Sequence, residues 1–113
     1  MGDCLFCRIA THQVPAQIVE ETEELVAFRD INPQAPTHLL IIPKALVAAI
    51  SDVTDATAPL VTKAVLLANR LATQEGISEG YRLVINCGAQ AGQSVWHLNL
   101  HLLGGRPMRW PPG

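Results

Sequence analysis

Apolar residues recur along this chain with two different spacings, one typical of a helix and one typical of strands. Between residues 55 and 75, Leu60, Leu67 and Leu71 repeat at distances of one or two helical turns. That spacing puts them on one face and predicts a long amphipathic helix over 55–75. Pro59 fits the first helical turn, because its missing N–H would have no partner there.

Short apolar runs, separated by charged or proline-containing turns, make up most of the remaining chain. Their lengths are typical of strands, and the charged turn over 21–24 joins the first two into a hairpin. A short helix is expected over 4–10, ahead of the first strand. The strands are expected over residues 18–20, 25–29, 38–42, 81–87 and 95–103.

Five strands, one long helix and a short N-terminal helix together predict an α+β fold built on a five-stranded antiparallel sheet. The length of 113 residues suits a single domain over 1–113. Apolar residues make up 49% of the chain, which is enough for one core at this length. Aromatic residues make up only 4%, so we expect the core to be aliphatic.

Charge and cysteine content narrow the classes of partner. A net charge of −2 lacks the basic surface that nucleic-acid binding requires, so we expect no nucleic-acid partner. No apolar run is long enough to cross a bilayer, so we expect no membrane association. With no secretory signal pattern and three cysteines, an odd number, the expectation is a reduced, cytoplasmic protein.

The run over 95–103 contains the most informative pattern in the sequence. As a strand, it would place His97, Asn99 and His101 on one face and turn the intervening leucines toward the core. The preceding loop contains Gly92, and the backbone N–H groups of such loops bind anions. Three nitrogen-bearing side chains beside an anion-binding loop favour a site for a phosphate-bearing ligand over a strand that is merely polar on its outer face.

The segment over 93–103, which reads QSVWHLNLHLL, resembles the signature of the histidine triad (HIT) family and in particular of its Hint branch. That signature alternates three histidines with apolar residues and ends in two more apolar residues, and only Asn99 departs from it. Residues 28–38 are similar to the family's nucleoside-side strand and loop. Residues 104–106 and 110–113 are similar to the Hint C-terminus.

The resemblance implies a HIT-like fold that binds a purine nucleotide. Hint proteins hydrolyse nucleoside 5′-phosphoramidates through a nucleotidyl-histidine intermediate, releasing an amine and leaving a monophosphate such as AMP. By the same resemblance, Phe28, Asp30 and Ile31 would line the nucleoside pocket, with the Asp30 carboxylate on the ribose hydroxyls. The residues implied around the α-phosphate are Asn86, Gly92, Gln93, Ser94, Asn99 and His101.

Catalytic roles follow from the same resemblance. His38 and His97 would be the outer histidines of a proton relay, a task suited to side chains that titrate near neutrality. The family is homodimeric, and Trp110 would reach toward the site of the partner chain. The implied catalytic residues are His38, Ser94, His97, Asn99 and His101.

Several of these residues have a plainer interpretation when each is taken alone. Asp30 also fits a loop-capping role, because carboxylates often close turns. His38 also fits a hydrogen-bonded position in the core. Trp110 stands among prolines and also fits simple packing of the C-terminal tail.

Asn99 occupies the position at which the family carries its nucleophilic histidine. A carboxamide nitrogen has no free lone pair and does not titrate near pH 7, so Asn99 cannot attack phosphorus. The side chain can still form a hydrogen bond to phosphate, so we expect nucleotide binding with turnover reduced by roughly 10⁴- to 10⁶-fold. Asn99 fits either a substitution introduced to trap a ligand or a natural binding protein without turnover.

Cys4 and Cys7 have the CxxC spacing of zinc sites and redox pairs. Some HIT proteins bind structural zinc through such a pair, the first triad histidine and one more histidine near the end of the His38 strand. Residues 44–47 occupy that last position here and contain no histidine. Cys4, Cys7 and His97 would be three of the four ligands that a closed zinc site needs, so we expect reduced thiols and no cofactor rather than zinc.

Two other functions remain compatible with the sequence. The first is a non-enzymatic nucleotide sensor that uses the same pocket, which activity measurements on the natural protein would separate from a hydrolase. The second is a zinc-dependent interaction module organised by Cys4 and Cys7, which metal analysis of the purified protein would detect.

Overall fold

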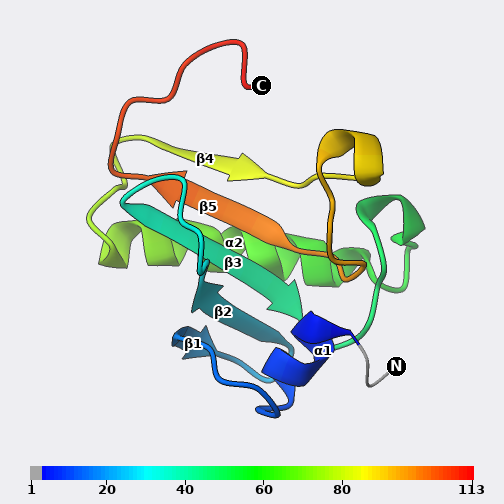
Figure 1. Ribbon diagram of the computed structural model, residues 1–113. Helices are drawn as coiled ribbons and strands as arrows, with labels where there is room; N and C mark the ends of the chain where they lie inside the picture. Colours follow the sequence, from blue (N-terminus) through cyan, green and yellow to red (C-terminus); the bar gives the residue numbers. More distant parts are fainter. Residues whose placement is uncertain (1–3) are drawn as a thin grey trace.

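Residues 4–113 are described by a computed structural model, in which five antiparallel strands form one sheet (Figure 1). The first three residues of the expected domain lie outside this range. The strands lie in the order β1-β2-β3-β5-β4, so β3 is central and β1 and β4 are the edges, which confirms the expected α+β fold. Their bounds are β1 (Ile18–Glu21), β2 (Leu25–Arg29), β3 (Thr37–Pro43), β4 (Tyr81–Val84) and β5 (Leu100–Gly104).

Two helices cover opposite faces of the sheet (Figure 1). The long helix α2 (Ala58–Gln74) has Pro59 in its first turn and buries the apolar stripe that predicted it. The short helix α1 (Leu5–Ala10) begins after Cys4, whose sulfur accepts a hydrogen bond from the N–H of Cys7. Within the described residues, no helix has the length and apolar character needed to cross a membrane.

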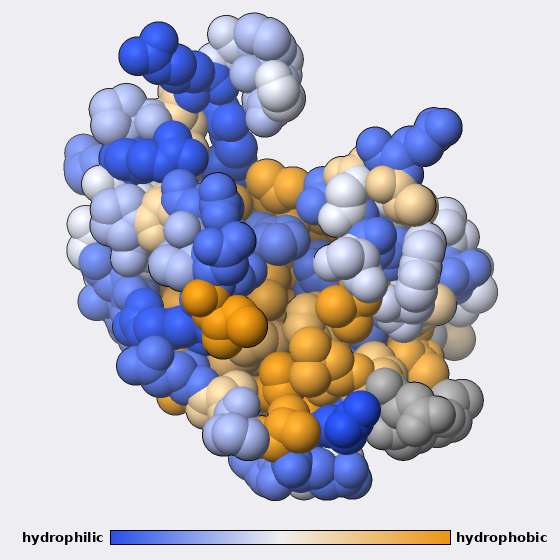
Figure 2. Space-filling view, viewed as in Figure 1, coloured by the Kyte–Doolittle hydropathy of each residue, from blue (hydrophilic) through white to orange (hydrophobic). Residues whose placement is uncertain are grey.

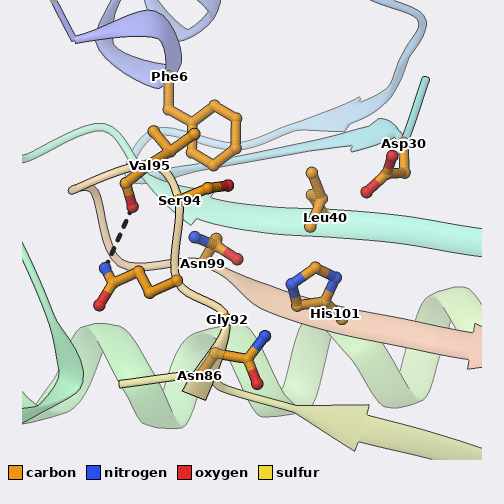
Figure 3. A pocket seen from close by; sticks show the side chains of 10 residues that line it. Phe6, Asp30, Leu40, Asn86, Gly92, Ser94, Val95, Asn99 and His101 are labelled. Carbon is orange, nitrogen blue, oxygen red and sulfur yellow. Dashed lines mark hydrogen bonds between the residues drawn. The ribbon is translucent and has the colours of Figure 1, made fainter. Parts of the chain in front are cut away.

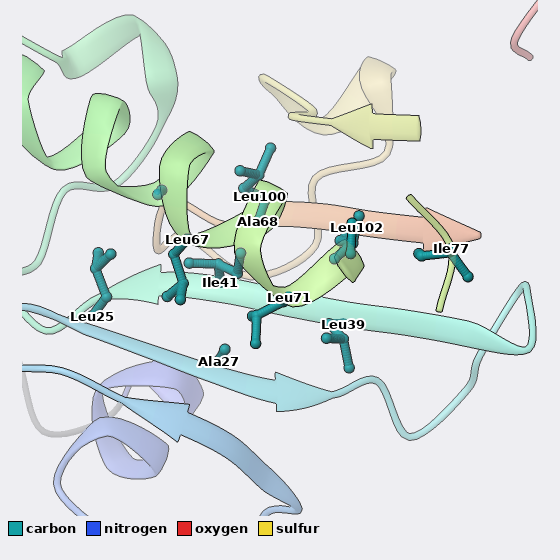
Figure 4. Close-up of a cluster of buried hydrophobic side chains, with 12 residues drawn as sticks. Leu25, Ala27, Leu39, Ile41, Leu67, Ala68, Leu71, Ile77, Leu100 and Leu102 are labelled. Carbon is teal, nitrogen blue, oxygen red and sulfur yellow. The ribbon is translucent and has the colours of Figure 1, made fainter. Parts of the chain in front are cut away.

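Aliphatic packing on both faces holds the sheet between the helices. The larger cluster lies between α2 and the sheet and includes Leu39, Ile41 and Leu71, none of them more than 1% exposed (Figure 4). The smaller cluster lies under α1, where the rings of Phe6 and Phe28 pack edge to face with their centroids 5.5 Å apart. Each fully buried side chain of this size contributes about 1.5–3 kcal/mol, so both helices are fixed firmly on the sheet.

The last strand is shorter than the sequence pattern predicts. β5 begins only at Leu100, because residues 95–99 bend away instead of extending the ladder with β3. At the end of β3, the Pro43 carbonyl accepts a hydrogen bond from the ring of His97 at 2.7 Å rather than from an N–H of β5. The N–H of Leu98 likewise donates to a carbonyl in the loop after β3.

The loop between β4 and β5 also starts earlier than expected. The strand expected over 81–87 ends at Val84, and the chain then leaves the sheet. A short 3-10 turn over Ala89–Ala91 follows, flanked by Gly88 and Gly92. The extra loop length, together with the bend over 95–99, leaves room for a pocket beside β5 on the face that carries α1.

Candidate functional site

A small pocket of about 120 Å³ lies on the face of the sheet that carries α1. Apolar side chains gather over the strands and α1 at the centre of this face, with hydrophilic side chains around them (Figure 2). Polar groups reach the hollow from β5, from the loop after β2 and from the loop between β4 and β5 (Figure 3). The lining residues are Phe6, Asp30, Leu40, Asn86, Gly92, Gln93, Ser94, Val95, Asn99 and His101.

The loop between β4 and β5 forms one wall of the pocket and is held by its own hydrogen bonds. Gly88 and Gly92 have φ angles of 89° and 98°, a region that glycine enters freely. Gln93 is only 7% exposed, and its side chain accepts from the Gly88 N–H and donates to two backbone carbonyls. The N–H groups of Gly92 and Gln93, which were expected to hold phosphate, donate to carbonyls inside the loop. The wall therefore presents the side chain of Ser94 rather than these two N–H groups.

A chain of hydrogen bonds runs from the loop after β2 to the pocket through two histidines. The backbone N–H of Gln34 donates to His38 Nδ1 at 3.0 Å, so that nitrogen carries no proton. In the neutral ring the proton is then on Nε2, which lies 2.9 Å from His101 Nδ1 and 3.5 Å from an Asp30 carboxylate oxygen. His101 Nδ1 accepts the hydrogen bond from His38 Nε2–H, so the proton of the neutral His101 ring is on its Nε2. That Nε2–H lies on the other side of the ring and points toward the pocket (Figure 3).

Burial keeps His38 and His101, the two histidines of this hydrogen-bonded relay, neutral. Desolvation lowers the pKa of His38, which is 5% exposed, and outweighs the opposing attraction of the Asp30 charge. Burial also lowers the pKa of His101, and the nearby His38 lowers it further. A neutral His101 therefore meets a ligand as a single N–H donor and not as a cation.

Asn99 lies beside His101 on the pocket wall, and its amide orientation is determined by a backbone contact. The Asn99 Nδ2 donates to the His97 carbonyl at 2.9 Å. A carbonyl can only accept, so the nitrogen and the oxygen of the amide cannot be exchanged. The Asn99 Oδ1 is therefore the atom turned toward the His101 side of the pocket (Figure 3).

His97 does not join Asn99 and His101 in the pocket, which corrects the expected row of three. It is fully buried, because residues 95–99 bend and tuck its ring under α1. Its Nε2–H donates to the Pro43 carbonyl, and its Nδ1 lies 3.2 Å from Cys4 Sγ and 3.3 Å from Cys7 Sγ. Burial lowers the pKa of His97 and raises that of the Cys7 thiol, so both groups are neutral in the absence of metal.

Three residues expected in the nucleoside and partner contacts lie outside the pocket lining. Phe28 is 4% exposed and belongs to the core under α1, whereas Ile31 and Trp110 are 99% and 84% exposed. Phe6 and Val95, which sequence reasoning did not select, line the pocket instead. The only sequence signal for Phe6 was its apolar position in the first helix, which cannot show that α1 packs beside a strand far along the chain.

Two groups of potential metal ligands occur among residues 4–113, and the positions of their protons separate them. Asp30, His38 and His101 converge within 4.8 Å. However, His38 accepts a hydrogen bond at Nδ1 and keeps its proton on Nε2, the atom that faces the group. A protonated ring nitrogen has no lone pair for a metal, so these residues form a hydrogen-bonded relay and not a metal site.

In the second group, Cys4, Cys7 and His97, the histidine proton lies on the ring nitrogen that faces away from the other ligands. The His97 Nε2–H donates to a backbone carbonyl, so the lone pair of Nδ1 points at both sulfurs. Histidines that bind metals commonly make this second contact, and two thiols with one imidazole suit zinc. The cluster formed by the described residues supplies three of the four ligands of a closed zinc site, which leaves one coordination position for water or another molecule.

Comparison with known proteins identifies the family of this chain. The HIT domain family model matches residues 11–108. An uncharacterized HIT-like protein of Synechococcus elongatus is 47% identical over 111 residues, covering 98% of this chain and 97% of the relative. A protein of Zea mays named as a 14 kDa zinc-binding protein is 45% identical over 111 residues, covering 96% and 87% of the two chains. The chain therefore belongs to the HIT family.

A solved structure gives the same result at the level of the fold. The crystal structure of a HIT family hydrolase from Legionella pneumophila has a TM-score of 0.96 and 55% sequence identity, covering 98% of this chain and 100% of that one. These comparisons confirm the HIT membership and the HIT-like fold that the sequence predicted. They also support the hydrolase class for this chain.

Proposed function

We propose that this chain binds a purine nucleotide of the nucleoside 5′-phosphoramidate or monophosphate class and cleaves it poorly. The observation that supports the proposal is the content of one pocket. Asp30, His101 and Asn99 line it together, and they come from the loop after β2, from β5 and from the residue just before β5 (Figure 3). The Asp30 carboxylate suits a ribose, and the His101 N–H donor suits a phosphoryl group. The Asn99 amide lies where a nucleophile would be needed and cannot act as one.

The polar groups divide the proposed ligand between them. Asp30 Oδ1 accepts the N–H of Asn32 at 2.8 Å, which fixes the carboxylate at the pocket edge while its other lone pairs remain for ribose hydroxyls. His101 Nε2–H and the Asn86 amide then face the phosphoryl group. With neutral donors and no cationic side chain in the lining, recognition rests on hydrogen bonds rather than on net charge.

Asn99 would occupy the place of the nucleophile. In HIT proteins that cleave P–N bonds, a histidine attacks phosphorus and is transiently nucleotidylated. The Asn99 amide has no lone pair on nitrogen for this step, so the covalent intermediate cannot form. Losing the nucleophile of a group that acts as a unit typically reduces turnover by ~10⁴- to 10⁶-fold.

Calorimetric titration with AMP, GMP and CMP tests the binding part of the proposal without requiring catalysis. We expect AMP and GMP to bind with similar heats and CMP to bind more weakly, because a purine ring covers more apolar surface than a pyrimidine ring. Asp30→Ala should weaken binding of all three nucleotides, because it removes the proposed ribose acceptor. If no nucleotide binds to the folded protein, the proposed function is wrong.

The substitution Asn99→His tests the assignment of the nucleophile position. We expect the variant to gain hydrolysis of adenosine 5′-phosphoramidate, by ~10⁴-fold or more over the unaltered chain, because it restores a lone pair beside phosphorus. Release of AMP, followed by chromatography, is the measurement, and Asn86→His is the matched control elsewhere in the pocket. A variant that still binds nucleotide but gains no hydrolysis would contradict this role.

A second function, zinc-dependent interaction, is favoured by the Cys4, Cys7 and His97 cluster. Zinc bound there would join α1 to the segment before β5 and would supply structural cross-linking rather than catalysis. Metal analysis of freshly purified protein is the test, with Cys4→Ser plus Cys7→Ser as the control. About one zinc per chain that is lost in the control supports this function, and near-zero zinc excludes it.

A further inference from the structure

The pocket holds a hydrogen-bond donor and a hydrogen-bond acceptor next to each other, where the phosphoryl group of the proposed ligand would lie. The donor is His101 Nε2–H, and the acceptor is Asn99 Oδ1 (Figure 3). Neither atom can exchange its role, because another hydrogen bond of the same side chain fixes the His101 tautomer and the Asn99 amide orientation. A ligand that uses both groups must therefore offer an acceptor to His101 and a donor to Asn99.

The donor is fixed by the relay behind it. His101 Nδ1 accepts from His38 Nε2 at 2.9 Å, and His38 Nδ1 accepts from the backbone N–H of Gln34 at 3.0 Å. Moving the proton of His101 to Nδ1 would bring two N–H groups into opposition inside a buried pair. His101 therefore faces the pocket as a donor.

The acceptor is fixed by the bend before β5. Asn99 Nδ2 donates to the carbonyl of His97 at 2.9 Å, in a segment whose position is held by the buried His97 ring. Flipping the amide would place its oxygen against that carbonyl and lose the bond. Asn99 therefore presents its oxygen, and a ligand gains a hydrogen bond from it only by offering a donor.

A nucleoside monophosphate at pH 8 has only acceptor oxygens on its phosphoryl group, whereas a phosphoramidate also has an N–H on phosphorus. We propose that Asn99 is a specificity-determining residue whose Oδ1 accepts the P–N–H of an intact nucleoside phosphoramidate while His101 Nε2–H donates to a phosphoryl oxygen. This inference rests on the proposed function. It means that the pocket selects the uncleaved amidate over the monophosphate that cleavage would leave.

The expected selectivity follows from the burial of Asn99. A site built to accept an N–H rejects an analogue without one, and the ratio grows with the exclusion of water. Asn99 is half-buried, so water can partly satisfy an unused oxygen. We expect a ratio of about tenfold in Kd, which corresponds to one ordinary hydrogen bond.

The test compares two ligands of equal charge and similar size. Adenosine 5′-phosphoramidate and adenosine 5′-phosphorofluoridate each have one negative charge, but only the first has an N–H on phosphorus. Calorimetry at pH 8 on the full chain should give a Kd about tenfold lower for the phosphoramidate. Phosphorus NMR after each titration shows whether the ligand is still intact.

Two variants separate the role of Asn99 from a general effect on the pocket. Asn99→Leu keeps the approximate volume but removes the acceptor, so its two Kd values should become equal within about twofold. Asn86→Ala is the matched control, and it should weaken both ligands while keeping their ratio. Circular dichroism shows whether each variant is folded, and the ratio in the unaltered chain is itself a complete test.

Equal affinities in the unaltered chain, with both ligands bound, would overturn this inference and leave the proposed function standing. A ratio that persists in Asn99→Leu would also overturn it, because another group would then accept the N–H. If neither ligand binds to the folded chain in the titration, the proposed function fails and the inference fails with it. A tenfold ratio that disappears only in Asn99→Leu supports both.

Discussion

A buried imidazole has one proton to place, and its hydrogen-bond partners determine where the proton lies. His38 is protonated at Nε2 because Gln34 donates to its other nitrogen, whereas His97 is protonated at Nε2 because the Pro43 carbonyl needs a donor. The consequences differ, since the free lone pair of His97 points at two thiols and that of His101 is already used by His38. Residues of one type therefore serve as a relay in one place and as a potential metal ligand in another.

Neutral histidines predict a loss of stability at mildly acidic pH. Burial lowers the pKa of His38 and His101 below the ordinary value of 6.5 in the folded chain. The unfolded chain therefore takes up protons first, so their contribution is fully present above 6.5 and falls as pH drops through 6.5 toward the folded pKa values. We expect the free energy of unfolding in urea to be lower at pH 5.5 than at pH 7.5.

The substitution His38→Gln is the matched variant for this measurement. It removes one titrating group, so its unfolding free energy should fall less between the two pH values than that of the unaltered chain. The pKa of Glu75 is held below its ordinary value of 4.5 by the hydrogen bond from Arg29, so its own contribution is lost only at still lower pH. An unfolding free energy that is the same at both pH values would contradict the assignment of neutral, buried histidines.

At the scale of elements, an ion pair joins the end of β2 to the end of α2. Arg29 contacts Glu75 through two parallel bonds of 2.9 and 3.0 Å, and the Thr37 hydroxyl approaches the same carboxylate at 3.5 Å. Glu75 is the C-cap of α2, where the helix dipole disfavours a negative charge. Arg29 offsets that effect, and the pair determines how the helix end lies on the sheet.

A double-mutant cycle measures the coupling within this pair. We expect Arg29→Met and Glu75→Gln to show an interaction free energy of about 1 kcal/mol, since the geometry is bidentate but the Arg29 side chain is 36% exposed. Urea unfolding of the four proteins at low salt is the measurement. Repeating the cycle in 1 M salt should reduce the coupling, and a coupling of zero at low salt would show that the pair is merely a surface contact.

Sequence periodicity was sufficient for the elements whose structure is determined by local burial. The helix over 58–74 and the strands near 25–29 and 38–42 follow from their own apolar patterns, because each element buries its stripe whatever lies beside it. The alternation over 95–103 was misleading, because its first half bends to bury His97 beside Cys4 and Cys7. Cys4 and Cys7 lie 93 and 90 positions from His97 in the sequence, and no local pattern reports that contact.

The candidate site divides in the same way. Asn99 and His101 could be selected from the alternating polar pattern beside a glycine loop, and Asp30 from the family resemblance of residues 28–38. The direction in which each proton points could not, because it depends on the N–H of Gln34 and on the His97 carbonyl, which the bend before β5 brings to the Asn99 amide. Motif reasoning therefore identifies the groups of this pocket, and only the hydrogen-bond network identifies their polarity.

At the scale of the whole molecule, exposed apolar groups and open sheet edges are the features that favour the prediction of a second copy of the chain as partner. β1 and β4 form the two edges of the sheet, and Trp110 and Ile31 are 84% and 99% exposed. Native proteins usually protect such edges, and two-fold symmetric dimers are the commonest oligomers. We expect a homodimer, and sedimentation should give twice the 12.2 kDa mass of one chain.

Trp110→Ala tests whether the tail of one copy reaches the pocket of the other. We expect nucleotide binding to weaken several-fold, because the indole would no longer cover the ligand in the partner's pocket, while the unfolding free energy of the chain changes little. Trp96→Ala, at a position that is 54% exposed, is the matched control. A sedimentation mass of one chain would rule out this role for Trp110.

The polarity of the whole relay begins at a backbone amide, the N–H of Gln34. A main-chain donor is indifferent to the side chain it belongs to, so the loop after β2 can vary in sequence without reversing the protons of His38 and His101. Proline is the one residue without this N–H. A proline at position 34 would thus free His38 to turn its proton outward and would leave His101 able to meet a ligand as an acceptor, changing the chemistry of a pocket that position 34 never touches.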